Sequence, residues 1–154
     1  MWAPWRLDYI KGPKPDECVF CAKPREDDDE ASYVLHRGET CFVILNAFPY
    51  NNGHAMVTPY DHVSSVEDLD DRTLLELMTL TRRLLAALRE VYGPEGFNVG
   101  VNIGEAAGAG VKDHVHLHVV PRWAGDTNFM PVIGDTRVLP QSLEDSFRAL
   151  RTAF

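Results

Sequence analysis

The sequence predicts an α+β fold in which a long helix covers one face of an antiparallel sheet. Short segments of alternating apolar residues lie on either side of turn-rich stretches, which is typical of hairpins. Only one long segment, from Asp70 to Tyr92, carries apolar residues at helical spacing over many turns. The predicted elements follow one another as β-β-β-α-β-β-α, an order with hairpins and a single long helix, which favours this fold class.

The totals indicate one domain spanning residues 1–154, because 154 residues with 45% hydrophobic and 25% charged side chains are typical of an ordinary globular protein. No apolar run reaches the ~20 residues that span a bilayer. The N-terminus has no basic segment followed by an apolar one, so it does not resemble a signal peptide. The odd number of cysteines, three, fits a reducing compartment. We therefore expect a cytoplasmic protein without a membrane partner.

The net charge limits the class of ligand. A formal charge of −8 argues against broad binding to nucleic acid, which needs a basic surface. It does not exclude a small ligand that carries phosphate. Backbone N–H groups, helix N-termini and a few local cations can hold such a ligand.

Three strands are predicted in the first half of the chain. Residues 1–17, rich in proline, tryptophan and charge, are expected to form a surface arm, and the acidic residues 25–30 a solvated loop. Tyr33–Arg37 and Thr40–Leu45 read as a hairpin. His54–Pro59 forms the next strand after a turn-rich stretch. Cys41 is expected in the core and His36 at the surface.

Two helices are predicted. The first begins after Asp70, a good N-cap residue, and ends at Gly93-Pro94. The second is a short amphipathic helix over residues 139–152. The apolar face of the first helix is formed by Leu74, Leu77, Met78, Thr81, Leu84, Leu85, Leu88, Val91 and Tyr92.

The last two strands carry the most informative residues. Phe97–Ile103 alternates and leads through the small-residue loop Gly104–Gly110 to the strand Asp113–Arg122, which Pro121 is expected to end. Along this strand three of the six histidines alternate with apolar residues, so they share one face. They are His114, His116 and His118.

Three readings of these histidines differ in the chemistry they need. One ion could be held by two of them, but three alternate strand positions spread over ~13 Å, too far for a single ion. A neutral imidazole could instead attack phosphorus, with its neighbours positioning the phosphate. The third reading is a polar edge strand. Asn102 and the small-residue loop, which can form a nest of backbone N–H groups for an anion, favour phosphate chemistry.

The motifs resemble the histidine triad superfamily of nucleotidyl hydrolases and transferases. H-V-H-L-H-V-V fits its pattern of alternating histidines, and C-V-F-C, L-N, N-G-H-A-M-V-T-P and V-N-I-G-E-A-A-G-A-G fit the segments before it. W-A-P-W-R and V-V-P-R-W-A-G-D-T-N-F-M-P-V look like a bacterial branch akin to diadenosine tetraphosphate phosphorylases and dinucleoside polyphosphate hydrolases. The resemblance implies an antiparallel five-stranded sheet, no organic cofactor and a homodimer whose sheets meet edge to edge.

The resemblance also implies roles for individual residues. His116 would form a covalent nucleotidyl intermediate, His118 would contact the bridging or another phosphate oxygen, and His54 would support the triad that His114 opens. The implied nucleotide contacts are Asn46 to the ribose, Asn102 and the backbone of Gly108, Ala109 and Gly110 to phosphate, and Phe20 and Ile44 to the base. Many members have Ser or Thr at the position of Gly110, and losing that hydrogen bond, worth ~1.5–3 kcal/mol, would alter substrate preference.

Cys18 and Cys21 have the C-x-x-C spacing of half a zinc site. His62 and His114 are the candidates to complete it, and zinc-bearing members of the superfamily use this set of four. A structural zinc would take His114 away from phosphate. The other interpretation is a pair of reduced, half-buried thiols.

The leading hypothesis is an enzyme that cleaves dinucleoside polyphosphates at the α-phosphate through a nucleotidyl-His116 intermediate. Water or inorganic phosphate would accept the nucleotide. Two alternatives are a nucleoside phosphoramidate hydrolase, which usually lacks the W-A-P-W-R and P-R-W-x-G-D segments, and a zinc-stabilised nucleotide-binding module without significant catalysis. The intact triad argues against the second.

Overall fold

Five antiparallel strands form one sheet in the order β1-β2-β3-β5-β4. The computed structural model describes residues 17–126 and 139–154, so the predicted N-terminal arm lies almost entirely outside them. The strands are β1 (Val34–Arg37), β2 (Cys41–Leu45), β3 (Ala55–Pro59), β4 (Gly96–Val101) and β5 (Leu117–Arg122). The predicted α+β class and its five strands are confirmed.

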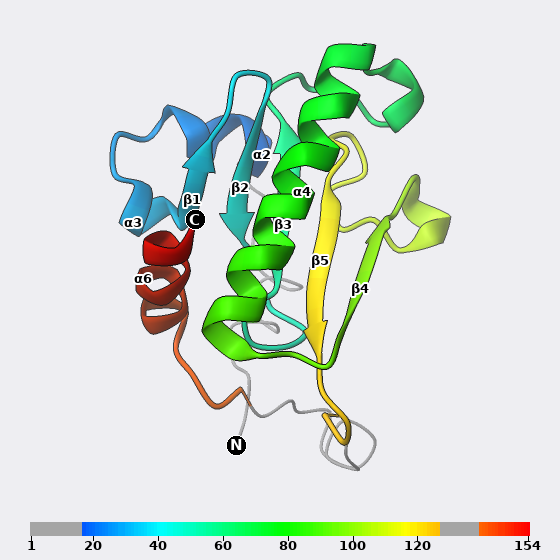
Figure 1. Ribbon diagram of the computed structural model, residues 1–154. Helices are drawn as coiled ribbons and strands as arrows, with labels where there is room; N and C mark the ends of the chain where they lie inside the picture. The colour runs from blue at the N-terminus through cyan, green and yellow to red at the C-terminus, as the bar shows by residue number, and fades with distance from the viewer. Residues whose placement is uncertain (1–16, 127–138) are drawn as a thin grey trace.

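One long helix crosses the sheet, and short helices lie near β1 (Figure 1). The helices are α2 (Val19–Ala22), α3 (Asp29–Ser32), α4 (Asp71–Tyr92) and α6 (Leu143–Ala153), and the 3-10 turns are η1 (Lys23–Arg25), η2 (Val66–Asp68) and η3 (Glu105–Ala107). The main core lies between the sheet, α4 and α6. No helix within residues 17–126 and 139–154 is both long and apolar enough to cross a membrane.

The ends of α4 follow from local sequence. The Asp70 side chain accepts a hydrogen bond from the Thr73 N–H at 2.8 Å, and Gly93 ends the helix with a φ of +54°. The predicted apolar face is correct except at Met78, which is 55% exposed. Met78 lies about 100° around the helix from the buried Leu77, which places it beyond the sheet contact.

The histidine strand begins later than predicted, at Leu117 instead of residue 113. Its pairing with β3 stops where Val57 faces Leu117. Two positions further along β3, Pro59 has no N–H to offer a ladder. The hydroxyl of Thr58 instead donates to the Val115 carbonyl at 3.0 Å. His114 and His116 therefore lie in a segment that is free of the regular ladder.

Pro121 does not end β5, which runs to Arg122. The pairing of β5 with β3 has already ended at Val119. The N–H that Pro121 lacks is therefore not needed for pairing with β3. The Pro121 carbonyl is nevertheless used there, because it accepts a hydrogen bond from the Asn51 side chain at 3.1 Å. On its other side β5 stays paired with β4, where Pro121 faces Phe97.

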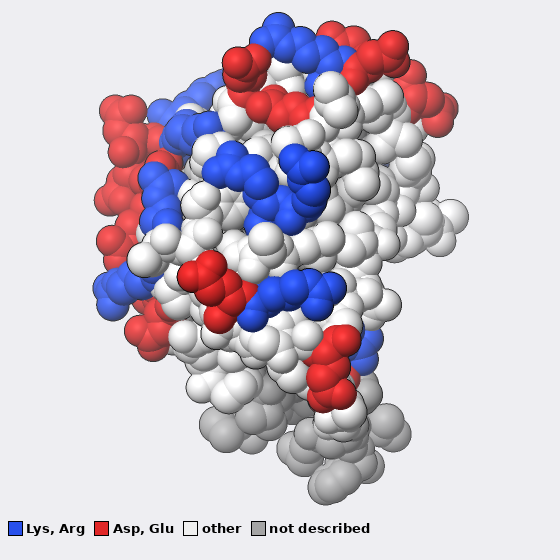
Figure 2. Space-filling view, viewed as in Figure 1, with Lys and Arg blue, Asp and Glu red and all other residues white. Residues whose placement is uncertain are grey.

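Two other expectations about the surface are only partly correct. Residues 25–30 are exposed except for Asp29, as predicted, but they are not all loop, because Asp28 caps α3 and Asp29 pairs with Arg37 and Arg151 at 2.8 and 3.1 Å. Figure 2 shows these acidic side chains along the α3 edge. His36 is half-buried, with its ring 5.0 Å from that of Phe154.

The C-terminal helix starts later than predicted, at Leu143, where Ser142 accepts a hydrogen bond from the Asp145 N–H at 3.1 Å. The serine supplies an N-cap that residue 139 lacks. Cys41 is buried in the core as predicted.

Glu76 of α4 holds the β1–β2 turn. Its carboxylate accepts hydrogen bonds from the N–H groups of Glu39, Thr40 and Cys41 and from the Thr40 hydroxyl. Burial acts to raise the pKa of Glu76, but these hydrogen bonds outweigh it and the pKa lies below its ordinary value of 4.5. A side chain on Gly38 would meet the carboxylate at 2.5 Å, so the turn needs glycine here.

We expect Glu76→Ala to lower the free energy of unfolding by about 2–4 kcal/mol, because three amides lose a charged acceptor. Because the folded-state pKa is lowered, the stabilisation by Glu76 is complete above pH 4.5 and is lost as the pH falls through the folded value. The difference between wild type and Glu76→Gln in urea unfolding should therefore shrink in acid. Glu90→Gln, exposed on the same helix, is the control and should match wild type throughout.

Candidate active site

The histidines lie on the face of the sheet opposite α4. Leu117 and Val119 pack in the main core, whereas His116 and His118 alternate with them and face the other way. A second apolar cluster on this opposite face consists of Phe20, Val34, Phe42, Ile44 and Met56. The predicted division of the strand into an apolar and an imidazole face is confirmed.

His116 is held in one tautomer. Its Nδ1 lies 2.8 Å from the His114 carbonyl oxygen, which can only accept, so Nδ1 carries the proton and Nε2 keeps its lone pair. The residue is only 4% exposed, and burial lowers its pKa below 6.5. The ring packs 4.8 Å from that of Phe20. The site thus presents a neutral imidazole with a free ring nitrogen.

The proton of His118 is placed by a chain of hydrogen bonds. The Tyr50 N–H donates to His54 Nδ1 at 3.0 Å, so the proton of a neutral His54 is on Nε2. His54 Nε2 lies 3.0 Å from His118 Nδ1 and donates to it. His118 consequently carries its own proton on Nε2. Burial, followed by the electrostatic interaction with the neighbouring His116, lowers the pKa of His118 to about 4, so His118 is neutral at pH 7.

His114 is separated from the other two triad histidines. It is fully buried, and its Nε2 donates to the Pro59 carbonyl at 2.9 Å. Its Nδ1 therefore keeps a lone pair, which is directed at other side chains. That nitrogen lies 3.2 Å from His62 Nδ1 and 3.4 Å from the Cys18 sulfur.

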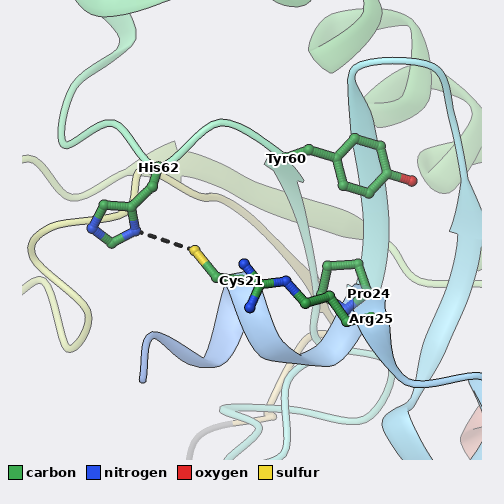
Figure 3. A pocket seen from close by; sticks show the side chains of 5 residues that line it. All are labelled: Cys21, Pro24, Arg25, Tyr60 and His62. Atoms are coloured by element: carbon green, nitrogen blue, oxygen red, sulfur yellow. Dashed lines mark hydrogen bonds between the residues drawn. The ribbon is translucent and has the colours of Figure 1, made fainter. Parts of the chain in front are cut away.

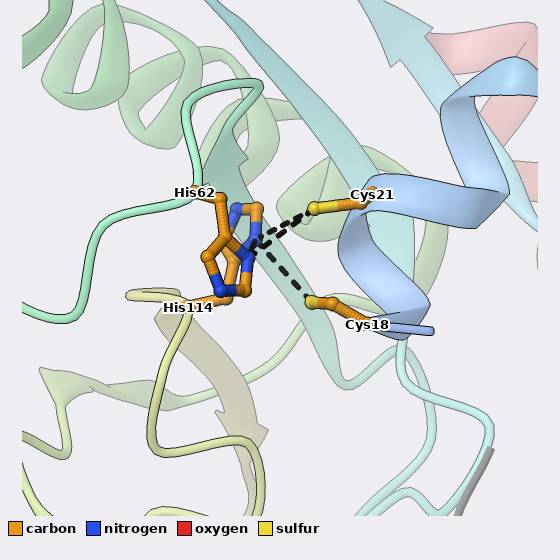
Figure 4. A group of neighbouring side chains, drawn as sticks. All are labelled: Cys18, Cys21, His62 and His114. Atoms are coloured by element: carbon orange, nitrogen blue, oxygen red, sulfur yellow. Dashed lines mark hydrogen bonds between the residues drawn. The ribbon is translucent and has the colours of Figure 1, made fainter. Parts of the chain in front are cut away.

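Cys18, Cys21, His62 and His114 form a cluster with the donor set of a metal site (Figure 4). Their four ligand atoms lie within 4.8 Å of one another, and the shorter separations are 3.2–3.6 Å. A tetrahedral zinc ion keeps such atoms about 3.3–3.8 Å apart. Cys18 caps α2 and Cys21 lies within it, so one turn of helix brings both sulfurs to the same side. The residues fit the ion.

A cavity of about 290 Å³ opens beside this cluster (Figure 3). It is lined by Cys21, Pro24, Arg25, Tyr60 and His62. Three of the four possible ligands are at least partly exposed, whereas His114 is buried.

The two residues predicted to hold the base, Phe20 and Ile44, lie together in the second apolar cluster. They are only 3% and 5% exposed. Asn46 lies beside His54, with its Nδ2 3.4 Å from His54 Nε2. Its Oδ1 accepts the Phe48 N–H at 2.9 Å.

The predicted phosphate contacts lie at the other end of the site. Asn102 follows β4 directly, and the pairing of Val101 with Leu117 places it across from His116. In the adjoining loop the N–H of Gly108 donates to Glu105 at 2.9 Å, and that of Ala109 lies 3.4 Å from the Gly104 carbonyl. Two of the three amides predicted to bind phosphate, those of Gly108 and Ala109, are thus hydrogen-bonded within the loop. Gly110 comes directly after them.

Sequence reasoning missed the residues that orient His54. The Tyr50 amide, Asn51 and Asp126 lie outside the triad, and a backbone donor leaves no residue signature. The only signals were the turn-rich stretch before the His54 strand, which contains Tyr50 and Asn51, and the segment P-R-W-A-G-D, which ends in Asp126.

The fold and the site together define a class of protein in which an antiparallel sheet carries a buried imidazole, next to a cluster of residues suited to binding a metal ion. A profile of the HIT domain matches residues 28–125, and the chain belongs to the HIT domain family.

Three relatives show how far the likeness extends. A Mycobacterium tuberculosis protein named AP-4-A phosphorylase is 42% identical over 160 residues, covering 99% of this chain and 82% of that protein. An adenosine 5'-monophosphoramidase of Schizosaccharomyces pombe is 30% identical over 68% of this chain and 74% of its own. The crystal structure of a zinc-bound histidine triad family protein from Mycobacterium smegmatis has a TM-score of 0.70 and 32% identity, covering 89% of this chain and 92% of its own.

Proposed function

We propose that this protein cleaves dinucleoside polyphosphates at the α-phosphate by transferring a nucleotidyl group to His116. The observation that carries the proposal is the buried His116 imidazole, whose Nδ1–H is bound by the His114 carbonyl so that Nε2 is free to attack. The 42% identity to the Mycobacterium tuberculosis AP-4-A phosphorylase supports this substrate class.

In the first step His116 Nε2 attacks the α-phosphorus, and the bond from phosphorus to the bridging oxygen breaks. The electron pair of that bond leaves with the nucleoside polyphosphate, which departs as an anion. His118 donates its Nε2–H to this oxygen as a hydrogen bond and stabilises the developing charge. His116 becomes a phosphorylated imidazolium, whose Nδ1–H remains on the His114 carbonyl.

In the second step an acceptor attacks the same phosphorus, and the bond to His116 Nε2 breaks. Water yields a nucleoside monophosphate and a proton that passes to solvent, and inorganic phosphate yields a nucleoside diphosphate. His116 returns to its neutral tautomer in both cases.

We assign the remaining contacts from the same geometry. Asn102, across from His116, and the backbone of Gly110 meet the phosphate oxygens. The N–H groups of Gly108 and Ala109 join them by exchanging their bonds within the loop for bonds to phosphate. Asn46 meets the ribose, and Phe20 with Ile44 forms the apolar support for the base. His54 acts through His118.

The name of the Schizosaccharomyces pombe relative makes phosphoramidates a second candidate substrate class. The leaving group of a phosphoramidate is an amine, which needs a full proton as the bond from phosphorus to nitrogen breaks. His118, with a pKa of about 4, is neutral at pH 7 and donates a hydrogen bond more readily than a proton. This difference favours polyphosphates, whose leaving group is an anion.

The test is incubation with diadenosine tetraphosphate, with and without inorganic phosphate. AMP with ATP indicates hydrolysis, and ADP with ATP indicates phosphorolysis. An adenosine phosphoramidate run in parallel separates the second candidate. No turnover of the dinucleotide under either condition would contradict the proposal.

We further propose that the four-residue cluster binds a structural zinc ion through Cys18, Cys21, His62 and His114. The separations of the ligand atoms and the lone pair on His114 Nδ1 support it. When bound, zinc supplies a cross-link between α2 and the histidine strand and no catalytic step. Holding His114 also holds the carbonyl that orients His116. Cys18, Cys21 and Cys41 form no disulfide, as expected in a reducing cytoplasm.

We also propose a homodimer in which β4 of one subunit lies beside β4 of its partner. β4 is the outer strand of the sheet next to β5 (Figure 1). Val99 on β4 is 45% exposed and Ile103 just beyond it is 44% exposed. An apolar outer strand with open backbone groups favours pairing with another strand.

We expect Val99→Arg to shift the protein from dimer to monomer, because a cation would be buried beside its own copy. Light scattering after size-exclusion chromatography measures the mass. Ala31→Arg, on exposed α3 at the β1 end of the sheet, is the matched control and should remain dimeric. A Val99→Arg dimer of unchanged mass would contradict this interface.

A further inference from the structure

The loop that leads into β3 wraps around His54. The Tyr50 N–H donates to His54 Nδ1 at 3.0 Å, and the Tyr50 ring stacks 4.8 Å from the imidazole. The His54 N–H in turn donates to the Asn51 carbonyl at 3.1 Å. Gly53 makes the turn with a φ of +74°, a conformation that glycine adopts without strain. The orientation of His54 therefore depends on Tyr50, Asn51 and Gly53.

The side chain of Asn51 ties this loop to the end of β5. Its Nδ2 donates to the Asp126 carboxylate at 2.8 Å and to the Pro121 carbonyl at 3.1 Å. Asn51, the residue after Tyr50, thus links this loop to the end of β5, about 70 positions further along the chain.

Asp126 is itself held firmly. Its carboxylate accepts from Arg122 Nε and Nη2 at 2.6 and 2.7 Å and from the Trp123 N–H at 3.2 Å. Arg122 also donates to Asn98 of β4 at 2.6 Å. The Asp126 side chain is only 8% exposed, so it is a fixed acceptor and not a solvated charge.

We propose that Asp126 and Asn51 are positioning residues that set the tautomer of His118 through the Tyr50 amide and His54. While the loop stays anchored, the Tyr50 N–H occupies His54 Nδ1, and His54 donates from Nε2 to His118 Nδ1. His118 then has its proton on Nε2, where it can meet the bridging oxygen. This role rests on the proposed nucleotidyl transfer, because it acts on the leaving group of that reaction.

The role has a specific kinetic signature. A hydrogen bond to the leaving oxygen matters more when that oxygen holds more negative charge, which is the case for leaving groups of higher pKa. Releasing the loop lets His118 adopt the Nδ1–H tautomer as well and removes the donor for part of the time. The rate should then fall most for poor leaving groups. A general loss of packing would lower all rates together.

The experiment measures kcat for a series of adenosine 5'-aryl phosphates that differ only in the pKa of the phenol. We expect Asn51→Ala and Asp126→Ala to slow the unsubstituted phenyl ester about 10-fold and the dinitrophenyl ester less than about 2-fold, which steepens the dependence on leaving-group pKa. Both residues act through the same contacts to the Tyr50 loop. The double variant should therefore lose no more kcat than the slower of the two single variants. Asn52→Ala, the neighbouring asparagine, is the matched control and should follow wild type.

A second measurement does not depend on turnover. Nitrogen-15 NMR of the histidine rings should show Nε2–H for His118 in wild type and a mixture of both tautomers in Asn51→Ala. Unchanged tautomers together with an unchanged leaving-group dependence in folded variants would overturn the proposal. If wild type cleaves neither the aryl esters nor the dinucleotide, nucleotidyl transfer fails, and the NMR comparison still decides whether Asn51 sets the tautomer.

Discussion

His116→Ala will reduce nucleotide release from diadenosine tetraphosphate by at least ~10⁴-fold, as expected for loss of a covalent nucleophile. The remaining residues still bind phosphate, but no other ring nitrogen replaces Nε2. His118 carries its proton on Nε2 and His114 is directed at the cysteine cluster. In wild type, acid-quenched samples should contain a protein species heavier by one nucleotidyl group, seen by mass spectrometry, which the variant lacks.

The matched control is His36→Ala, which removes a half-buried histidine from the edge strand β1. It should keep wild-type kcat. Because the His116 ring packs on Phe20, thermal unfolding of His116→Ala must first show that the variant is folded. A folded His116→Ala enzyme that turns over at the wild-type rate would refute the nucleophile assignment.

Loss of the proposed zinc will have the second large effect, this time on stability. Structural zinc sites supply folding free energy directly, and about 4 kcal/mol corresponds to a fall in Tm of about 8–16 °C for a chain of this size. We expect Cys18→Ser to lose the metal and to melt lower by an amount in this range. Metal analysis of the purified wild type should give one zinc per chain.

A chelator separates the metal from the side chain. Wild type should shift to the lower Tm after chelation and recover when zinc is returned. Cys18→Ser should respond to neither treatment. The zinc assignment is wrong if wild type contains no zinc, or if chelation leaves its Tm unchanged.

Much of the fold was predictable because it depends on near neighbours in the chain. Period-2 alternation located the strands, and Asp70 with Gly93 marked the ends of α4. The errors came where distant residues decide. Pro121 continues its strand because the β3 ladder has already stopped beside it, and Met78 is exposed because the sheet contact does not reach that side of α4.

The candidate site divides in the same way. The residue types and their spacing indicated imidazole chemistry and half a metal site. The structure brings His62 to Cys21, 41 positions earlier, with 3.3 Å between Nδ1 and sulfur. It also brings His54 to His118, 64 positions later. Neither pairing can be read from the spacing of the residues along the chain.

By itself, the sequence determined the fold class, the shared face of the histidines and the motifs of the HIT domain, because these follow from local periodicity and residue type. Only the tertiary structure decided that the three histidines are not equivalent. His114 keeps a lone pair on Nδ1, His116 on Nε2, and His118 offers an Nε2–H. A neutral imidazole has one donor and one acceptor nitrogen, and the partner that folding places beside each ring chooses which is which.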